Sequence, residues 1–346
     1  MTVYEADPLR DPRWNDFLAH AQGASIFHTP EWLRALEESY GYTPVVYTTS
    51  APGQAMENGV VFCRVNSVLT GRRLVSLPFS DHCEPLVRSE EELSAILSHV
   101  TRQAAGENIR YIEVRPLQER REMATGFAPH KTYQFHVVDL RKGPDRLFRG
   151  LHKNSFQRKV QRAAREGLTC QSGTSATLIE QFYELFVMTR RRHGLPPPPI
   201  AWIHSLVRHL GNAVQIRVVF RGELAVAGML TLVHNDTIVY KYGGSDLRYA
   251  HLGGMPLAFW TMMREASTQG LSWLDLGRCE SDNPGLIRYK DRLGSIRFPM
   301  TYWRAPESSG HLPESLPYSE VARRICSAAP DAVRVLAGRI LYRHFG

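Results

Sequence analysis

Apolar and polar positions alternate with two periods along the first 140 residues. Spacing of about 3.6 residues predicts helices, and alternation with a period of two predicts half-buried strands. The expected helices span residues 11–21, 30–40 and 91–105, and the expected strands span 43–49, 59–65, 73–77, 110–115 and 132–140. Gly, Pro and Asn turns separate these elements. This mixture predicts an α/β domain.

The pattern from residue 169 onward predicts a second α/β domain. It begins with a helix over 175–193, a stiff proline-rich connection and a hairpin turning at Arg221 and Gly222. A continuous unit follows over 236–304: a strand, a glycine loop at 243–254, a helix, a second strand, a polar turn, a short basic helix and a last aromatic strand. Its order and spacing are those of an α/β unit.

Positive charge is concentrated between these two domains. Residues 141–166 contain nine Lys and Arg residues against two acidic ones, a net charge of +7 in a chain whose total is +8. The segment has helical spacing, with its apolar residues along one side and arginines such as Arg158 on another, and Gly167 ends it. The segment is either a solvated linker helix or a binding face for an anionic partner, with Lys153 and Arg158 as candidate contacts.

Length and composition indicate a soluble globular protein with four parts. The 346 residues are 43% hydrophobic, which suits two ordinary domains. We expect an N-terminal domain at 1–140, a basic helical connector at 141–168, a C-terminal domain at 169–306 and a helical tail at 307–346. The chain has no apolar run of membrane-spanning length and no secretory signal at its start, so a cytoplasmic location is expected. The five cysteines lack zinc-ligand spacing, which predicts reduced thiols and no metal.

The tail at 307–346 interleaves apolar residues and arginines. This pattern predicts a pair of basic amphipathic helices broken at Pro330. Such helices could contact an anionic membrane through residues 317–346, or their apolar face could close the C-terminal domain. A lipid-linked substrate would favour the membrane and a location at its inner face.

The glycine loop of the 236–304 unit resembles the acyl-CoA loop of the GNAT acyltransferases. In that superfamily an Arg or Gln followed by x-x-Gly-x-Gly or Ala wraps the pyrophosphate of CoA. Here Arg248-Tyr-Ala-His-Leu-Gly253 has the Arg and the last Gly, but His251 stands at the first Gly. A side chain at that position would obstruct a close approach of the pyrophosphate.

A narrower resemblance is to the FemAB-related, or Fem-type, branch of that superfamily. It is carried by Tyr240-Lys-Tyr-Gly-Gly-Ser, Asp275-Leu-Gly-Arg278 and Gly285-Leu-Ile-Arg-Tyr-Lys290, and by 27–32 and 77–86 in the first half. It covers most of residues 20–305. The resemblance implies two tandem GNAT-like mixed-sheet domains. It also implies transfer of amino acids from aminoacyl-tRNA to an amine of a peptidoglycan precursor.

The candidate catalytic residues are Lys290, Asp81 and His82. The resemblance implies that Lys290 stabilises the developing oxyanion or the leaving group, whereas without the motif it would be an exposed helical lysine paired with Asp291. Asp81 or His82, in a proline-bracketed loop, could accept a proton from the attacking ammonium, although Asp81 could also be a turn former. The sequence leaves open which of the two is the base.

Four further residues are candidates for substrate binding. Arg115 and Arg278 each follow or end a strand, where a guanidinium could bind a phosphate or carboxylate bidentately or form a surface ion pair. Tyr242 could position a substrate through its hydroxyl or pack in the core. Arg248 is either a phosphate ligand or an ordinary loop cation.

Three functions remain after these observations. The first is a Fem-like N-acyltransferase that moves an aminoacyl or acyl group onto an amine of a cell-envelope or polysaccharide precursor. The sequence shows no nucleophile elbow, so direct transfer is expected. The donor would be aminoacyl-tRNA or acyl-CoA, with no other cofactor, and the acceptor a small or lipid-linked precursor. The alternatives are a CoA-dependent N-acetyltransferase of an amino sugar and a non-catalytic envelope-assembly or RNA-binding protein.

Overall fold

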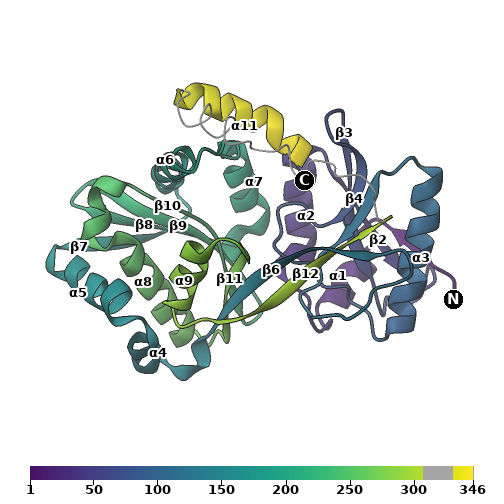
Figure 1. The fold of residues 1–346 in the computed structure, drawn as a ribbon, viewed down its shortest axis with the longest axis horizontal. Coiled ribbons are helices and arrows are strands. Elements are labelled where there is room, and N and C mark those ends of the chain that lie inside the picture. The colour runs from purple at the N-terminus through teal and green to yellow at the C-terminus, as the bar shows by residue number, and fades with distance from the viewer. Residues whose placement is uncertain (307–329, 346) are drawn as a thin grey trace. The chain divides into compact units, whose positions relative to one another are not determined.

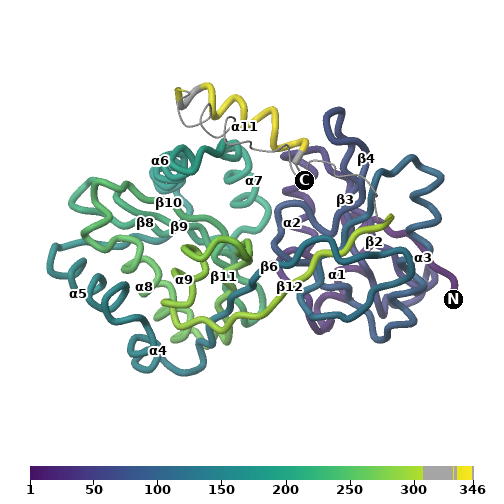
Figure 2. Tube along the Cα trace, viewed as in Figure 1, coloured from purple at the N-terminus to yellow at the C-terminus, as the bar shows by residue number. Residues whose placement is uncertain are grey.

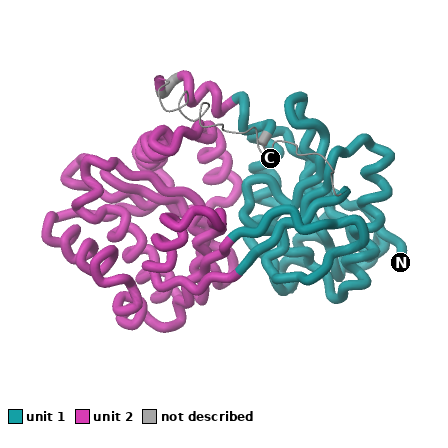
Figure 3. Tube along the Cα trace, viewed as in Figure 1, with its two compact units in different colours: residues 1–133, 299–316, 340–346 teal, residues 134–298, 317–339 magenta. Residues whose placement is uncertain are grey.

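The computed structural model describes residues 1–306 and 330–345, drawn in Figure 1. Within these residues the chain forms two compact units (Figure 3). Unit 1 comprises residues 1–133, 299–306 and 340–345, and unit 2 comprises 134–298 and 330–339. The chain crosses from one unit to the other within strands β6 (Ala128–Asp139) and β12 (Ile296–Ala305), whose course Figure 2 shows. The bounds of the four expected parts stay a prediction.

Unit 1 is built on a mixed sheet with the strand order β1-β2-β3-β4-β5-β12. Pairing is antiparallel except between β4 and β5, which are parallel. The bounds are β1 Tyr4–Ala6, α1 Pro12–Leu18, η1 Ile26–His28, α2 Pro30–Tyr40, β2 Thr43–Thr48, β3 Val60–Ser67, β4 Gly71–Ser76, α3 Glu90–Gly106 and β5 Tyr111–Val114. The predicted elements of residues 11–115 are therefore present in this order.

The core of unit 1 lies between α3 and the sheet. One face of α3 buries Leu93, Ile96, Leu97 and Val100 against alternate residues of β2, β3, β4 and β5. Ser89 caps the helix by accepting a hydrogen bond from the backbone N–H of Glu92. The 3.6-residue period of the helix and the two-residue period of the strands together bring the apolar side chains into one layer.

Unit 2 has the strand order β6-β11-β10-β9-β8-β7, and β10 pairs with β11 in parallel. Its elements after β6 are η2 Leu140–Lys142, α4 Pro144–Gly150, η3 Lys153–Gln157, α5 Arg158–Arg165, β7 Leu168–Gly173, α6 Ala176–Arg192, α7 Ile200–Leu210, η4 Gly211–Ala213, β8 Val214–Arg221, β9 Leu224–His234, β10 Thr237–Ser245, η5 Leu247–Leu252, α8 Gly254–Thr268, β11 Trp273–Glu280 and α9 Pro284–Asp291. The strands and helices predicted at 236–304 are confirmed in their order, whereas part of the expected glycine loop is strand β10 and the 3-10 helix η5.

Helices α8 and α6 cover opposite faces of the unit 2 sheet (Figure 1). Ala227 and Met229 of β9 belong to the core under α8, whereas Gly228 between them faces Phe182 and Leu185 of α6. This alternation is the two-residue period of a strand buried on both faces. Gly244 of β10 has no side chain, which lets the backbone of α6 approach at Leu185.

The basic segment at 141–168 belongs to unit 2 and is not one continuous helix. Helix α4 ends at Gly150, Leu151 is extended, and the π-helical turn η3 then leads directly into α5. The predicted apolar side is confirmed, because Leu147, Leu151, Phe156, Val160 and Ala163 are all buried. Most of these residues join the core under α8, so the segment is anchored by its apolar face and exposes its basic one.

Several elements differ from the expectation. Strands β1 and β7 and helix α7 were not expected from the sequence, although Ile203 and Leu206 of α7 have helical spacing and are buried. In the tail, helix α11 (Asp331–Phe345) begins directly after Pro330, as predicted. The other helix of the expected pair lies outside the described residues. The part of α11 from Ile340 onward belongs to unit 1, so the tail does not simply close the C-terminal domain.

Candidate functional site

Strands β10 and β11 separate in the middle of the unit 2 sheet. Parallel pairing joins 237–239 to 273–275, and it ends there in the described chain, although β10 continues to Ser245 and β11 to Glu280. Just beyond the last pair, Gly277 has a φ of 72°, in the left-handed region that favours glycine. The carboxylate of Asp275 accepts a 2.6 Å hydrogen bond from the N–H of Gly277 and fixes this bend. The Asp275-Leu-Gly-Arg278 motif therefore shapes the end of β11.

Lys290 is held by this bend. Its Nζ donates to the carbonyl oxygens of Gly277 and Arg278, each at 3.0 Å. The side chain is 6% exposed and comes from α9, which Asn283 caps at its N-terminus. In a regular strand successive carbonyls point to opposite sides, so the left-handed residue allows both to face one ammonium. Lys290 is therefore not the exposed helical lysine of the alternative interpretation.

A buried histidine beside Lys290 was missed in the sequence. His136 of β6 is fully buried, with its Nε2 3.4 Å from Asp291 Oδ1 and its Nδ1 3.9 Å from the sulfur of Cys279. Burial lowers the pKa of His136 and the positive charge of Lys290 lowers it further, against the opposing effect of Asp291. The imidazole is therefore neutral at pH 7. Nothing in the sequence singles it out, because it is a lone histidine within a predicted strand.

The glycine loop packs against the basic segment. A Cβ at Gly253, whose φ is 89°, would lie 2.4 Å from the carbonyl oxygen of Lys159 in α5. This oxygen carries partial negative charge and fills the space on that side of Gly253, where a phosphate would be repelled. Arg248 pairs with Asp246 at 2.6 Å and its side chain is 73% exposed, while His251 is exposed.

The other predicted residues of unit 2 lie in different surroundings. The hydroxyl of Tyr242 accepts a 3.0 Å hydrogen bond from Trp202 Nε1, and its ring lies 5.1 Å from that of Phe186. Lys153 and Arg158 are exposed on η3 and α5. Their segment contacts α9, since the rings of Phe156 and Tyr289 are 5.4 Å apart and the N–H of His152 donates to the carbonyl of Arg292. The structure thus brings Lys290, the backbone of Arg278 and the basic segment together.

In unit 1, Arg115 anchors the loop that contains Asp81 and His82. Its guanidinium pairs with the buried Glu113 at 2.7 Å and donates to the carbonyls of Leu77 and Ser80. Arg115 is therefore part of a buried ion pair and not of a surface pair, and its binding of a phosphate or carboxylate stays a prediction.

The same loop is fixed at further points. The hydroxyl of Tyr302 donates to the carbonyl of Asp81 at 2.5 Å, and the N–H of Cys83 donates to the backbone carbonyl of Arg115. His82 is buried with its ring edge-on to Phe27, whereas Asp81 is half-buried. Burial raises the pKa of the Cys83 thiol, consistent with a structural cysteine. A loop held this firmly is suited to presenting a side chain in a fixed position.

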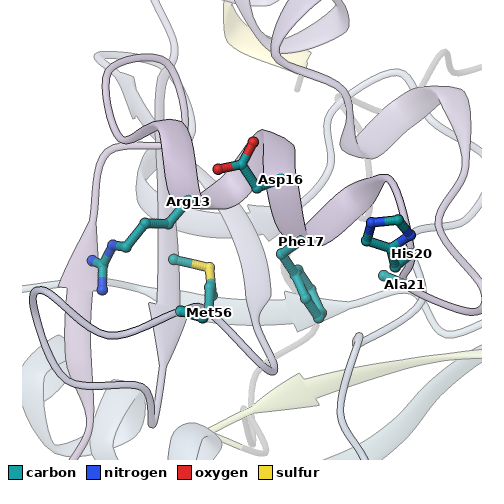
Figure 4. Close-up of a pocket in the computed structure, with 7 residues that line it drawn as sticks. Arg13, Asp16, Phe17, His20, Ala21 and Met56 are labelled. Carbon is teal, nitrogen blue, oxygen red and sulfur yellow. The ribbon is translucent and has the colours of Figure 1, made fainter.

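Unit 1 also has a hollow at its surface, formed by described residues. A cavity of about 370 Å³ opens on unit 1 beside α1, where Phe17 and Met56 provide apolar walls and Arg13, Asp16 and His20 a polar rim (Figure 4). It contains no residue predicted from the sequence. Within 1–306 and 330–345, no group of three His, Cys, Asp or Glu side chains could hold a metal. No helix of these residues is long and apolar enough to cross a membrane.

The family that the chain matches falls within unit 2. Residues 151–291 match the family described as the acetyltransferase (GNAT) domain, and this match ends directly after Lys290. The UDP-N-acetylmuramoylpentapeptide-lysine N(6)-alanyltransferase of Weissella viridescens is 30% identical to this chain over 112 residues. These residues are 32% of this chain and 33% of the relative, so the chain spans about one third of the length of the curated relative it matches.

Solved structures extend the likeness to both units. FemX has a TM-score of 0.67 at 13% identity, covering 87% of this chain and 97% of that one. The chain is thus similar to Fem-type transferases in sequence over about one third of its length and in fold over both units. A tandem GNAT protein from the clavulanic acid biosynthesis pathway has a TM-score of 0.54 at 10% identity, covering 89% of this chain and 99% of that one. The fold is therefore the tandem GNAT-like α/β fold that the sequence predicted.

The ion pairs of Glu113 predict an acid-sensitive unit 1. Burial alone would raise the pKa of this carboxyl, but Arg115 and Arg304 outweigh it and lower the pKa to about 2. Because the folded pKa is below the unfolded one, the stabilisation is complete above about pH 5 and is lost as pH falls toward 2. We expect Glu113→Gln to lower the unfolding free energy at pH 7 by about 3 kcal/mol. Urea titrations between pH 7 and 3 would measure it.

The matched control is Glu119→Gln, which changes an exposed carboxyl six residues further along the chain. The difference between wild type and Glu113→Gln should shrink as the pH falls below 4, while Glu119→Gln should follow the wild type throughout. An unchanged difference across this range would show that the ion pairs do not determine the acid sensitivity.

Proposed function

We propose that this protein is a Fem-like N-acyltransferase that moves an aminoacyl group onto an amine of a cell-envelope precursor by direct transfer. The observation that carries the proposal is the buried ammonium of Lys290, fixed on the carbonyls of Gly277 and Arg278 where β10 and β11 separate. The related Weissella enzyme is named for alanyl transfer to N6 of a lysine in a UDP-linked muramoyl pentapeptide. That name supports an aminoacyl donor and an amine acceptor.

The proposed reaction needs a fixed positive charge. The acceptor amine attacks the ester carbonyl of the donor, a C–N bond forms, and the carbonyl oxygen becomes an oxyanion. The ester C–O bond then breaks, and the leaving oxygen takes up a proton while the ammonium loses one. An ammonium has three N–H donors, and backbone carbonyls take two of those of Lys290. The third can donate to the oxyanion with no reorganisation of the lysine.

Contacts of the glycine loop favour aminoacyl-tRNA over acyl-CoA as the donor. The carbonyl of Lys159 lies against Gly253, and Arg248 is already paired with Asp246. Both features disfavour a CoA pyrophosphate at this loop. By contrast, Lys153 and Arg158 are exposed on a segment that packs on α9 next to Lys290. Several phosphates of a nucleic acid could be neutralised there.

The acceptor and the base belong to the same proposal. Asp81 or His82 would take the proton from the acceptor ammonium, an assignment that stays a prediction from the sequence. Arg115 supports it by holding their loop. A lipid-linked acceptor would place the protein at the inner face of a membrane, with contact through residues 317–346, of which 317–329 and 346 lie outside the described residues.

A CoA-dependent N-acetyltransferase is the second candidate, because the family matched over 151–291 is described as an acetyltransferase domain. The two donors can be separated directly. Calorimetry that finds tight acetyl-CoA binding would favour the acetyltransferase. The absence of transfer from either donor would favour a non-catalytic binding protein.

Two glycines provide a matched test of the Lys290 site. Gly277 and Gly270 have φ values of 72° and 83°, so an alanine at either costs about 1–2 kcal/mol of stability. Only Gly277 positions Lys290, and a Cβ at Gly270 meets nothing within 4 Å. We expect Lys290→Ala to lower kcat by about 100- to 1,000-fold and Gly277→Ala by about tenfold or more. Gly270→Ala should keep the wild-type kcat. Single-turnover transfer from labelled aminoacyl-tRNA would measure these rates.

Thermal unfolding of each variant separates lost chemistry from lost fold. Full activity of folded Lys290→Ala would remove the lysine from the mechanism. Equal losses of kcat in Gly277→Ala and Gly270→Ala would mean that strain alone, and not the position of the ammonium, explains the effect.

The basic segment should contact phosphates of the tRNA. Removing two phosphate contacts with Lys153→Gln and Arg158→Gln should weaken tRNA binding and reduce the slope of log K against log salt by about 1 to 2. Arg221→Gln, which changes an exposed arginine at the β8–β9 turn, is the control and should leave the slope unchanged. Filter binding over a range of KCl concentrations would measure it. An unaltered slope in the double variant would place the tRNA elsewhere.

A further inference from the structure

Helix α11 exposes an apolar stripe. Val333, Leu336 and Ile340 are 53%, 55% and 53% exposed, and their spacing of three and four residues places them on one face of the helix. Exposed single apolar residues are ordinary, but a run along one helical face marks a contact surface. The sequence alone could not distinguish this stripe from residues that pack on the protein.

The other face of α11 is fixed to the protein, so the stripe is not the packing face. Gly338 packs directly against the backbone carbonyl of Pro197 in unit 2. In unit 1, the carbonyl of Tyr342 accepts a 3.0 Å hydrogen bond from the hydroxyl of Tyr42, and the rings of Tyr342 and Phe79 lie 5.5 Å apart. The helix therefore has a docked face and an exposed apolar face.

Arginines accompany the stripe. Arg339 and Arg343 are exposed on α11, and the sequence from Val333 to His344 contains no Asp or Glu. An apolar helical face with basic residues at its border is the arrangement of helices that lie in the interface of an anionic bilayer. A second copy of this chain would bring only further positive charge to the same face, which disfavours self-association.

A second apolar element lies next to the end of α11 in unit 1. The turn between β3 and β4 exposes Val68 and Leu69 by 93% and 55%. This turn is tied to the last turn of the helix, because Ser67 Oγ lies 3.0 Å from His344 Nδ1 and Thr70 Oγ1 donates to the His344 carbonyl. Arg73, next on β4, donates to the same carbonyl at 2.8 Å. Within unit 1, the β3–β4 turn and the part of α11 from Ile340 onward therefore both expose apolar side chains and are joined by these hydrogen bonds.

We propose that the exposed face of α11, with the β3–β4 turn, binds the surface of an anionic lipid bilayer. Apolar side chains would enter the interfacial region, and Arg339 and Arg343 would meet lipid phosphates. The lipid-linked acceptor rests on the proposed function. This surface would bring the site to that acceptor. Membrane binding is measured without the transfer reaction, so the two can fail separately.

The test is sedimentation of the full chain with vesicles of phosphatidylcholine alone and with vesicles that also contain phosphatidylglycerol. The wild type should bind the anionic vesicles and bind those of phosphatidylcholine far more weakly. Leu336→Ser with Ile340→Ser should reduce binding about tenfold or more by removing two apolar side chains. Arg339→Gln with Arg343→Gln should reduce it by roughly tenfold or more and weaken its salt dependence. Leu224→Ser, which changes an exposed leucine in unit 2, is the control and should bind as the wild type.

Three outcomes would overturn the proposal. One is no binding of the wild type to anionic vesicles, and another is equal binding of the Leu336/Ile340 variant and the Leu224→Ser control. The third combines two results: the wild type does not bind vesicles, and it forms a dimer in analytical ultracentrifugation that the α11 substitutions dissociate. This face would then be an interface between two copies. Transfer onto a water-soluble acceptor should be unchanged in the α11 variants. If the wild type shows no such transfer, only the proposed function is refuted.

Discussion

The left-handed bend of β11 at Gly277 is the constraint on which the candidate site depends. It lies just beyond the last residue that pairs with β10, and the carboxylate of Asp275 fixes it from two residues before. The bend directs two successive carbonyls to the Nζ of Lys290 and so determines where α9 carries its ammonium. A regular strand would offer one carbonyl on that side and would leave the lysine less firmly held.

Burial of the Lys290 ammonium has an energetic cost, which hydrogen bonds must offset. A charged lysine removed from water is costly unless polar groups replace its hydration, and each hydrogen bond from a charged donor contributes about 1.5–3 kcal/mol. The two carbonyls supply this compensation without cancelling the positive charge. The neighbouring His136 stays neutral, because it is buried beside that same charge. The ammonium is therefore held as a fixed positive charge, which is what the proposed transfer reaction needs.

The sequence predicted the elements that local patterns determine, namely the spacing of apolar residues and the turn residues at each end. The strands and helices predicted at 236–304 are present, and the structure places the motif from Asp275 to Arg278 beside Lys290. The sequence did not show how the motif holds Lys290, because a hydrogen bond from a lysine of α9 to backbone carbonyls of β11 requires no particular side chain in β11. Arg115 illustrates the same limit, since its pairing with Glu113 and with the loop carbonyls depends on strand register.

Other differences have equally specific causes. The basic segment has one helical period in sequence, yet an extended Leu151 divides it into two elements that pack under α8. His136 enters the site only because β6 is the neighbour of β11, and sheet order between distant strands cannot be read from the chain. The tail was expected either to pack or to remain free for a membrane. Helix α11 has a docked side and an exposed apolar side, because Gly338 packs on Pro197 while Val333, Leu336 and Ile340 are exposed.

The central claim is that the fixed ammonium serves aminoacyl transfer to an envelope amine. Mass spectrometry of envelope precursors from cells with and without this protein tests it most directly. The account predicts that deletion removes the mass of one amino acid residue from a single class of precursor, and that restoring the Lys290→Ala variant does not return it. Loss of an acetyl mass, or identical precursors in both cells, would contradict the account.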